Sequence, residues 1–282
     1  RQRQMCIRDS FKLGGNVYAF DSTTIDLCLS VFWWAKFRKK KGGIKVHTLY
    51  DVETQIPAFF HITEASVHDS KVMIEIPYEP SSYYIFDRGY NNFKILYKIH
   101  QIEAYFVVRA KKNLGYKSIQ WKRRLPKNVL SDASVFLTGF YPKQYYPEPL
   151  RLVKYWDEEQ EREFTFITNA MHISALQVAE LYKNRWQVEL FFKWLKQHLK
   201  IKRFWGTTEN AVRIQIYAAI CAYCLVAIIQ HDMQLNRSTY EVLQILSISL
   251  TDKTHLRDLF DKTKFQNDKE RFGPNGPSLF NF

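Results

Sequence analysis

Strand-type and helix-type segments alternate along the first 110 residues, and this order limits the fold more than any other feature of the sequence. Three strand-like segments come first, rich in β-branched and aromatic residues with alternating polarity. A short helix, an apolar strand, a longer helix and another strand follow. Strands followed by covering helices indicate an α/β layer fold with a mixed sheet flanked by helices. The segments are the strands 16–27, 42–51, 55–65, 82–87 and 104–110 and the helices 68–76 and 91–101.

The sequence changes in character after residue 110, where basic and proline-containing loops separate short β-like runs. The clearest hairpin is RLVKYWDEEQEREFTFITN, with its turn at DEEQ. Two long helices at 174–200 and 208–232 come next, before a shorter helix at 238–250. We therefore expect an α/β core at 13–110 and 169–232, a β-rich insertion at 111–168, and a C-terminal helix and tail at 233–282.

Residues 1–12 follow no pattern of the rest of the chain. The stretch QMCIRDS within them resembles translated adapter or vector sequence. We expect residues 1–12 to be foreign or disordered, and the natural protein to be truncated in front of them.

The chain carries 41 basic and 28 acidic residues, a formal net charge of +13. This excess indicates an anionic partner, with nucleic acid as the first candidate and a membrane surface as the competing one. The longest apolar run, Ile216 to Ile229, is 14 residues long, which suits a buried core helix better than a membrane span. Four cysteines and no apolar leader in the printed sequence favour a cytoplasmic setting without a membrane partner.

One polar stripe runs along the predicted helix AELYKNRWQVELFFKWLKQHLK. At about 100° per residue, its members lie within about 40° of Glu189. A solvated face with pairs four residues apart, each worth a few tenths of a kcal/mol, is one interpretation. A functional face is the other. The members are Tyr182, Arg185, Glu189, Lys193 and Lys196.

Three carboxylates follow or interrupt apolar runs: Asp21 after VYAF, Asp87 after YYIF and Glu189 after RWQV. A carboxylate at the end of a buried strand is costly unless it is paired or bound to a cation. Two Mg²⁺ or Mn²⁺ ions would remove the repulsion among three such acids and would suit phosphoryl transfer. Taken singly, Asp21 could instead form a turn or a cap, and Asp87 could be a turn residue.

The segments FDSTTI and IFDRGY and the spacing Tyr-x2-Arg-x3-Glu-x6-Lys together resemble the DDE transposases of bacterial insertion sequences, in particular the insertion-sequence-four group. The resemblance covers about residues 13–250. It implies a ribonuclease H-like core with a β-rich insertion between the second and third acids. Asp21, Asp87 and Glu189 would then hold the two metal ions.

The resemblance further implies DNA cleavage and strand transfer in a bacterial, nucleoid-associated setting. The partners would be double-stranded DNA (transposon ends and target) and a second copy of the chain on that DNA. Members of the group carry a helical N-terminal segment that recognises the transposon ends, and few residues precede Asp21 here. The alternative is a catalytically silent DNA-binding remnant. DNA contacts on the stripe are predicted for Tyr182, Arg185, Lys193 and Lys196.

Further DNA contacts are predicted outside the stripe. The run KFRKKKGGIK is either a solvated loop or a loop that follows phosphates, and KKNLGYKSIQWKRR is similar. A hairpin tryptophan, Trp156, could be a stacking platform for a flipped base, although a buried hairpin tryptophan is common. Asp69 could border the metal site, but capping of the helix after it is expected. The basic contacts are Arg38, Lys39, Lys40 and Lys41.

Overall fold

The computed structural model describes residues 13–38, 41–198, 204–249 and 253–262. The predicted foreign segment 1–12 lies outside them. The chain divides into two compact units, Arg1–Ala222 and Tyr223–Phe282. The strands are β1 (Val17–Leu27), β2 (Lys36–Arg38), β3 (Lys41–Asp51), β4 (Pro57–Glu64), β5 (Tyr83–Phe86), β6 (Tyr105–Arg109), β7 (Tyr116–Trp121), β8 (Val129–Leu137), β9 (Leu150–Asp157) and β10 (Arg162–Thr168). The helices are α2 (Asp69–Val72), α3 (Phe93–Gln101), α4 (Phe140–Tyr145), α5 (Ala175–Lys183), α6 (Trp186–His198), α7 (Glu209–Asp232), α8 (Thr239–Ile248) and α9 (Leu256–Lys262), with 3₁₀ turns η1 (Met73–Glu75) and η2 (Arg88–Tyr90).

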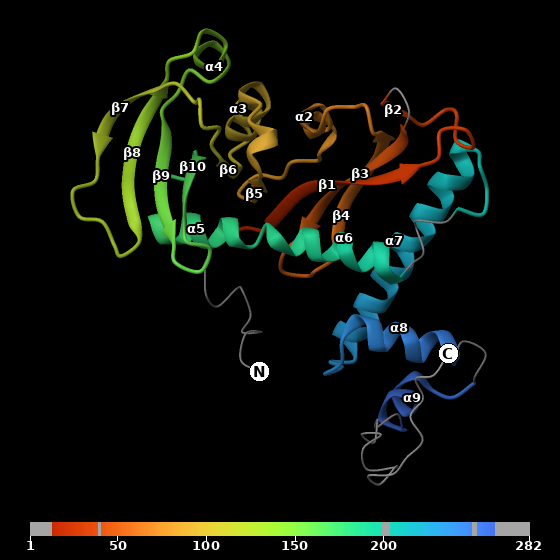
Figure 1. The fold of residues 1–282 in the computed structure, drawn as a ribbon. Helices are drawn as coiled ribbons and strands as arrows, with labels where there is room; N and C mark the ends of the chain where they lie inside the picture. Colours follow the sequence, from red (N-terminus) through yellow and green to blue (C-terminus); the bar gives the residue numbers. More distant parts are fainter. Residues whose placement is uncertain (1–12, 39–40, 199–203, 250–252, 263–282) are drawn as a thin grey trace. The chain divides into compact units, whose positions relative to one another are not determined.

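One mixed sheet organises the first unit, in the order β2-β3-β1-β5-β6-β10-β9-β8-β7, with β4 paired to β3. In Figure 1, α5 and α6 run along one face of this sheet, and α2 and α3 lie on the other. Packing contacts join α6 to β1 and β3, and α5 to β5 and β6. The predicted α/β fold, with a mixed sheet flanked by helices, is confirmed.

The central strands β1, β5 and β6 run parallel. Both faces of this part of the sheet are covered, which explains why all four residues of β5 are apolar and buried. The register pairs Phe20 with Phe86. The next residue along the chain is an acid in both cases: Asp21 lies within β1, which continues to Leu27, and Asp87 directly follows the end of β5. The order of elements in the sequence therefore fixes the first two acids as neighbours.

The strands between residues 111 and 168 extend the sheet of the core, because β10 pairs antiparallel with β6. A buried ion pair fastens them: Arg151 on β9 donates Nε to Asp132 on β8 at 2.7 Å. The same guanidinium donates to the carbonyl of Ile173 at 2.5 Å, directly before the Ser174 cap of α5. Burial raises the pKa of Asp132, but hydrogen bonds from Arg151 and Lys122 outweigh it and hold that pKa below its usual value. The insertion thus positions the start of α5.

The single helix predicted for 174–200 is wrong, because two helices, α5 and α6, occupy this stretch. Asn184 ends α5: its backbone N–H donates to Leu181 and Tyr182, and its side chain donates to the carbonyl of Glu180 at 3.1 Å. These bonds tighten the last turn and interrupt the α-helical ladder. Arg185 lies in the break, so a single helical wheel does not describe the polar stripe.

Helix α7 contains the long apolar run. By length and composition alone it could cross a membrane, but 33% of its most apolar window is buried, so the expected core helix is only partly buried. In the second unit, α8 begins with a capping box between Ser238 and Glu241. A small apolar core there is formed by Val226, Val242, Ile245 and Phe260.

Candidate active site

Two of the three predicted acids, Asp21 and Glu189, bond to the same arginine. Arg185 donates Nη1 to Asp21 Oδ2 at 2.9 Å and Nη2 to Glu189 Oε1 at 2.5 Å. The third acid, Asp87, is the neighbour of Asp21 through the β1–β5 register. Asp21 within β1, Asp87 after the end of β5 and Glu189 on α6 therefore share one region of the first unit.

Asp87 is held by different partners. The hydroxyl of Tyr182 on α5 donates to Asp87 Oδ1 at 2.9 Å, and Arg109 Nη1 lies 3.9 Å from the same oxygen. Tyr182 is buried, and burial together with the negative charge of Asp87 raises its pKa. The phenol therefore remains a hydrogen-bond donor at neutral pH and orients the Asp87 carboxylate.

The environments of the two aspartates push their pKa values apart. Burial raises the pKa of Asp21 to about 6, and the charges of Glu189 and Asp87 add to this, while the Ser22 N–H and Arg185 oppose it. Burial also raises the pKa of Asp87, but the Arg88 N–H and the Tyr182 hydroxyl outweigh it and leave that pKa below its usual value. Excess negative charge at Asp21 is what a bound cation would neutralise.

The donor set fits a hard divalent cation, because its members are carboxylates gathered around a positive charge. As the side chains stand, however, no three His, Cys, Asp or Glu residues in the described part of the chain are grouped closely enough to hold a metal. The guanidinium of Arg185 lies between Asp21 and Glu189 and bonds to one oxygen of each. A metal ion that binds both acids must compete with Arg185 for these oxygens.

A groove of about 480 Å³ lies over two of the acids. Lys193 and Lys196 of α6 line it together with Asp21 and Glu189. Of the predicted stripe, Glu189, Lys193 and Lys196 thus line one groove along α6. Tyr182, on the other side of the helix break, is instead buried against Phe166. We call this groove the acid groove; its lining is Asp21, Ser22, Thr23, Glu189, Phe192, Lys193, Lys196 and Gln197.

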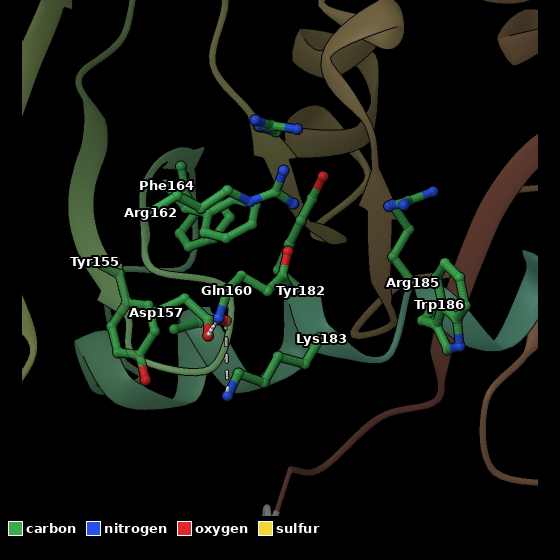
Figure 2. A pocket seen from close by; sticks show the side chains of 12 residues that line it. Tyr155, Asp157, Gln160, Arg162, Phe164, Tyr182, Lys183, Arg185 and Trp186 are labelled. Carbon is green, nitrogen blue, oxygen red and sulfur yellow. Dashed lines mark hydrogen bonds and ion pairs between the residues drawn. The ribbon is translucent and has the colours of Figure 1, made fainter.

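A second pocket, of about 410 Å³, lies between the β9–β10 hairpin and the start of α6 (Figure 2). The Phe164 ring lies under the guanidinium groups of Arg162 and Arg109, at 4.3 and 4.9 Å. Tyr155 lines this hairpin pocket, but Trp156 does not. Side chains alternate along a strand, so Trp156 lies on the opposite face of β9. Its predicted stacking role stays a prediction.

Asp69 has a different role from the predicted cap. His68 caps α2 by accepting the Ser70 N–H. Asp69 instead accepts the Ser22 hydroxyl at 2.8 Å and lies 3.1 Å from Lys45 Nζ. It therefore steadies the residue next to Asp21, which is close to the alternative that Asp69 borders the site.

The predicted basic loop contributes no side-chain geometry. Lys39 and Lys40 lie outside the described residues. Arg38 and Lys41 pair through their backbones at the ends of β2 and β3. DNA contacts by these four residues remain predictions.

Residues 12–225 match the family model described as Transposase DDE domain. A protein of Sinorhizobium fredii (strain NBRC 101917 / NGR234) with a provisional transposase name is 37% identical over 246 residues, which is 85% of this chain and 67% of that protein. The transposase assigned to insertion sequence element IS5377 of Geobacillus stearothermophilus is 30% identical over 218 residues, 77% of this chain and 58% of that protein. This chain therefore matches only part of the length of these relatives.

Among solved structures, piggyBac transposase in a synaptic complex with hairpin DNA is similar, with a TM-score of 0.49 and 14% identity over 88% of this chain and 56% of that one. The family assignment depends on the sequence matches. The family model covers most of the chain, and the Sinorhizobium relative exceeds 30% identity over two thirds of its own length. The chain belongs to the DDE transposase family.

Proposed function

We propose that this protein catalyses metal-dependent cleavage and strand transfer of DNA. The observation that carries the proposal is the contact of one buried guanidinium, Arg185, with acids from two distant elements, Asp21 and Glu189. Asp87 completes the set through the strand register. Ion pairs that serve stability alone do not require three carboxylates from two central strands and a helix to lie in one region.

In this proposal Asp21, Asp87 and Glu189 hold two Mg²⁺ or Mn²⁺ ions. Such ions, held by these residues, would supply activation of the attacking oxygen and stabilisation of the leaving oxygen of a phosphoryl transfer. Water, and then a DNA 3′-hydroxyl, is the nucleophile, and no covalent bond to the protein forms. Tyr182 keeps Asp87 oriented through its hydroxyl.

The proposed substrates are the double-stranded ends of an insertion sequence and a target DNA, both bound in the bacterial cytoplasm. Lys193 and Lys196 line the acid groove and contact DNA phosphates there. Arg185 would contact phosphates as well if it were released from Asp21 and Glu189. A homodimer on DNA and membership in the insertion-sequence-four group belong to the same proposal.

Nicking of supercoiled plasmid DNA in Mn²⁺ tests this function. The full chain should nick the plasmid, and Asp87→Asn should abolish nicking. Asp26→Asn is the matched control, because Asp26 is exposed near the end of the strand that carries Asp21. This variant should nick the plasmid as well as the unmodified chain does. If the unmodified chain binds DNA but does not nick it, the alternative of a catalytically silent DNA-binding remnant is supported. If Asp87→Asn nicks the plasmid as well as the unmodified chain does, Asp87 is not part of the active site.

A further inference from the structure

A third pocket, of about 320 Å³, lies where the insertion joins the core. Glu163 and Thr165 line it, whereas Arg162, Phe164 and Phe166 line the hairpin pocket. Because side chains alternate along β10, the two pockets lie on opposite faces of this strand. We call the third one the basic pocket. Its basic lining residues are Arg88, Arg109, Lys111, Lys112 and Lys154.

Most of the positive charge in the basic pocket has no acidic partner. Glu163 is the acid in its lining, and it lies 3.7 Å from Lys154. Within the described part of the chain, Arg88, Lys111 and Lys112 have no carboxylate within ion-pair distance. A surface that serves stability alone intersperses both signs of charge, so an uncompensated cluster in a concave site indicates an anionic ligand.

Arg88 supplies an independent observation. Its Nε is buried and has no hydrogen-bond partner among the described residues. A buried donor without a partner costs about 1–3 kcal/mol, and such a group in a native structure calls for a ligand, an ion or water. A guanidinium is the group best matched to phosphate oxygens, because its N–H groups form a planar fork.

The position of the basic pocket identifies the source of the phosphate. Arg88 directly follows Asp87, and Arg109 lines both this pocket and the hairpin pocket while lying 3.9 Å from Asp87. A phosphate held here is therefore next to the second acid of the proposed site. Tyr116, which is 39% exposed, adds an aromatic ring to the lining. Basic groups combined with exposed aromatic rings are typical of sites that follow a DNA strand.

We propose that the basic pocket binds backbone phosphates of the DNA strand that leaves the acids and runs over the insertion. This course of the DNA strand rests on the proposed function, because the proposed function places the DNA at Asp87. The ligand is the sugar–phosphate backbone rather than a particular base, so binding here holds the strand in position without reading its sequence.

Equilibrium DNA binding over a series of salt concentrations tests the proposal. The full chain is titrated onto a short fluorescent duplex in EDTA, so that no cleavage takes place. The variant Lys111→Gln/Lys112→Gln should bind at least about tenfold more weakly, and the slope of log K against log salt should fall by up to about two units, or about 0.9 per lost phosphate contact. Lys111→Arg/Lys112→Arg should restore both.

The matched control is Lys98→Gln/Lys143→Gln, which removes the same charge from exposed positions on α3 and α4. It should change the slope little. Equal losses in the two double variants would overturn the proposal, since net charge alone would then explain binding. Competition by inorganic phosphate as effective as that by DNA would also overturn it, by making the site one for free anions.

The outcome does not depend on catalysis. Asp87→Asn should keep full DNA binding in EDTA, so a basic-pocket variant that loses binding supports the pocket even if no variant ever nicks DNA. Conversely, if Lys111→Gln/Lys112→Gln nicks and binds DNA normally, the proposed role of the basic pocket is contradicted and the proposed function is unaffected. Thermal unfolding of each variant confirms that it is folded.

Discussion

Arg185, in the break between α5 and α6, donates a hydrogen bond to Asp21 on β1 at 2.9 Å across 164 positions of the sequence. The contact fastens the helical pair to the first strand, and the same guanidinium also holds Glu189. The arginine is 16% exposed and Asp21 is 21% exposed, so water screens the pair only partly. One side chain therefore affects both the stability of the fold and the affinity of the acids for a metal.

Replacing Arg185 by glutamine should lower the free energy of unfolding at neutral pH by about 1–3 kcal/mol, because Asp21 would keep a largely buried charge without its partner. Urea unfolding measures this. Lys127→Gln, which removes an exposed ion pair with Glu158, should change the same quantity by less than about 1 kcal/mol. Equal stability of Arg185→Gln and the unmodified chain would mean that the contact with Asp21 contributes nothing.

The raised pKa of Asp21 predicts a particular pH dependence of stability. A carboxyl group whose pKa is about 6 in the folded chain, above its ordinary value, stabilises the fold fully at low pH and loses that contribution as pH rises to about 6. Asp21→Asn stays neutral throughout. Its stability relative to the unmodified chain should therefore improve between about pH 4 and pH 8, by about 1–3 kcal/mol. A difference independent of pH, measured by urea unfolding without metal, would contradict the raised pKa.

Tyr182→Phe removes the hydroxyl that donates to Asp87. The pKa of Asp87 should then rise towards its ordinary value, because one hydrogen bond to the charged form is lost. Nicking at neutral pH should fall by up to about tenfold, and the acid side of the pH profile should move upward by up to about one unit. Tyr155→Phe is the control, since Tyr155 lines the hairpin pocket without touching an acid. Identical profiles for Tyr182→Phe and the control would exclude the positioning role.

Parts of this site could be predicted from the sequence because they follow from local pattern. Two apolar runs that each precede an acid predict neighbouring strands, and the β1–β5 register places the residues before Asp21 and Asp87 side by side. The break at Asn184 could not be predicted, since it depends on side-chain hydrogen bonds that do not interrupt the helical periodicity.

For the β9–β10 hairpin, the sequence predicts which residues share a face of the strand but not which face borders the site. Alternation assigns Tyr155 and Trp156 to opposite faces of β9, but pairing with β10 and packing against α5 decide which face borders Arg185. Arg109 gave no signal, because its partner Asp87 lies on a distant segment. Asp69 could be placed near the site from the sequence, but its contact with Ser22 could not.

Metal binding should be detectable without DNA. A ligand that binds only the folded state stabilises it by RT ln(1 + [L]/Kd), so Mn²⁺ should raise the Tm of the unmodified chain and of Asp26→Asn. The Tm of Asp87→Asn should stay constant, because that variant lacks a metal-binding charge. An equal rise in Tm for all three proteins would place the bound metal elsewhere.

Glu189→Gln gives the most direct test of an active site formed by the three acids. The substitution keeps the shape of the side chain on α6 and removes one negative charge that faces Asp21 across Arg185. Plasmid nicking in Mn²⁺ and duplex binding in EDTA are measured on the same preparation. We predict that nicking is lost while DNA binding stays equal or becomes slightly tighter. Full nicking by Glu189→Gln would contradict the assignment and return the polar face of α6 to a solvated surface.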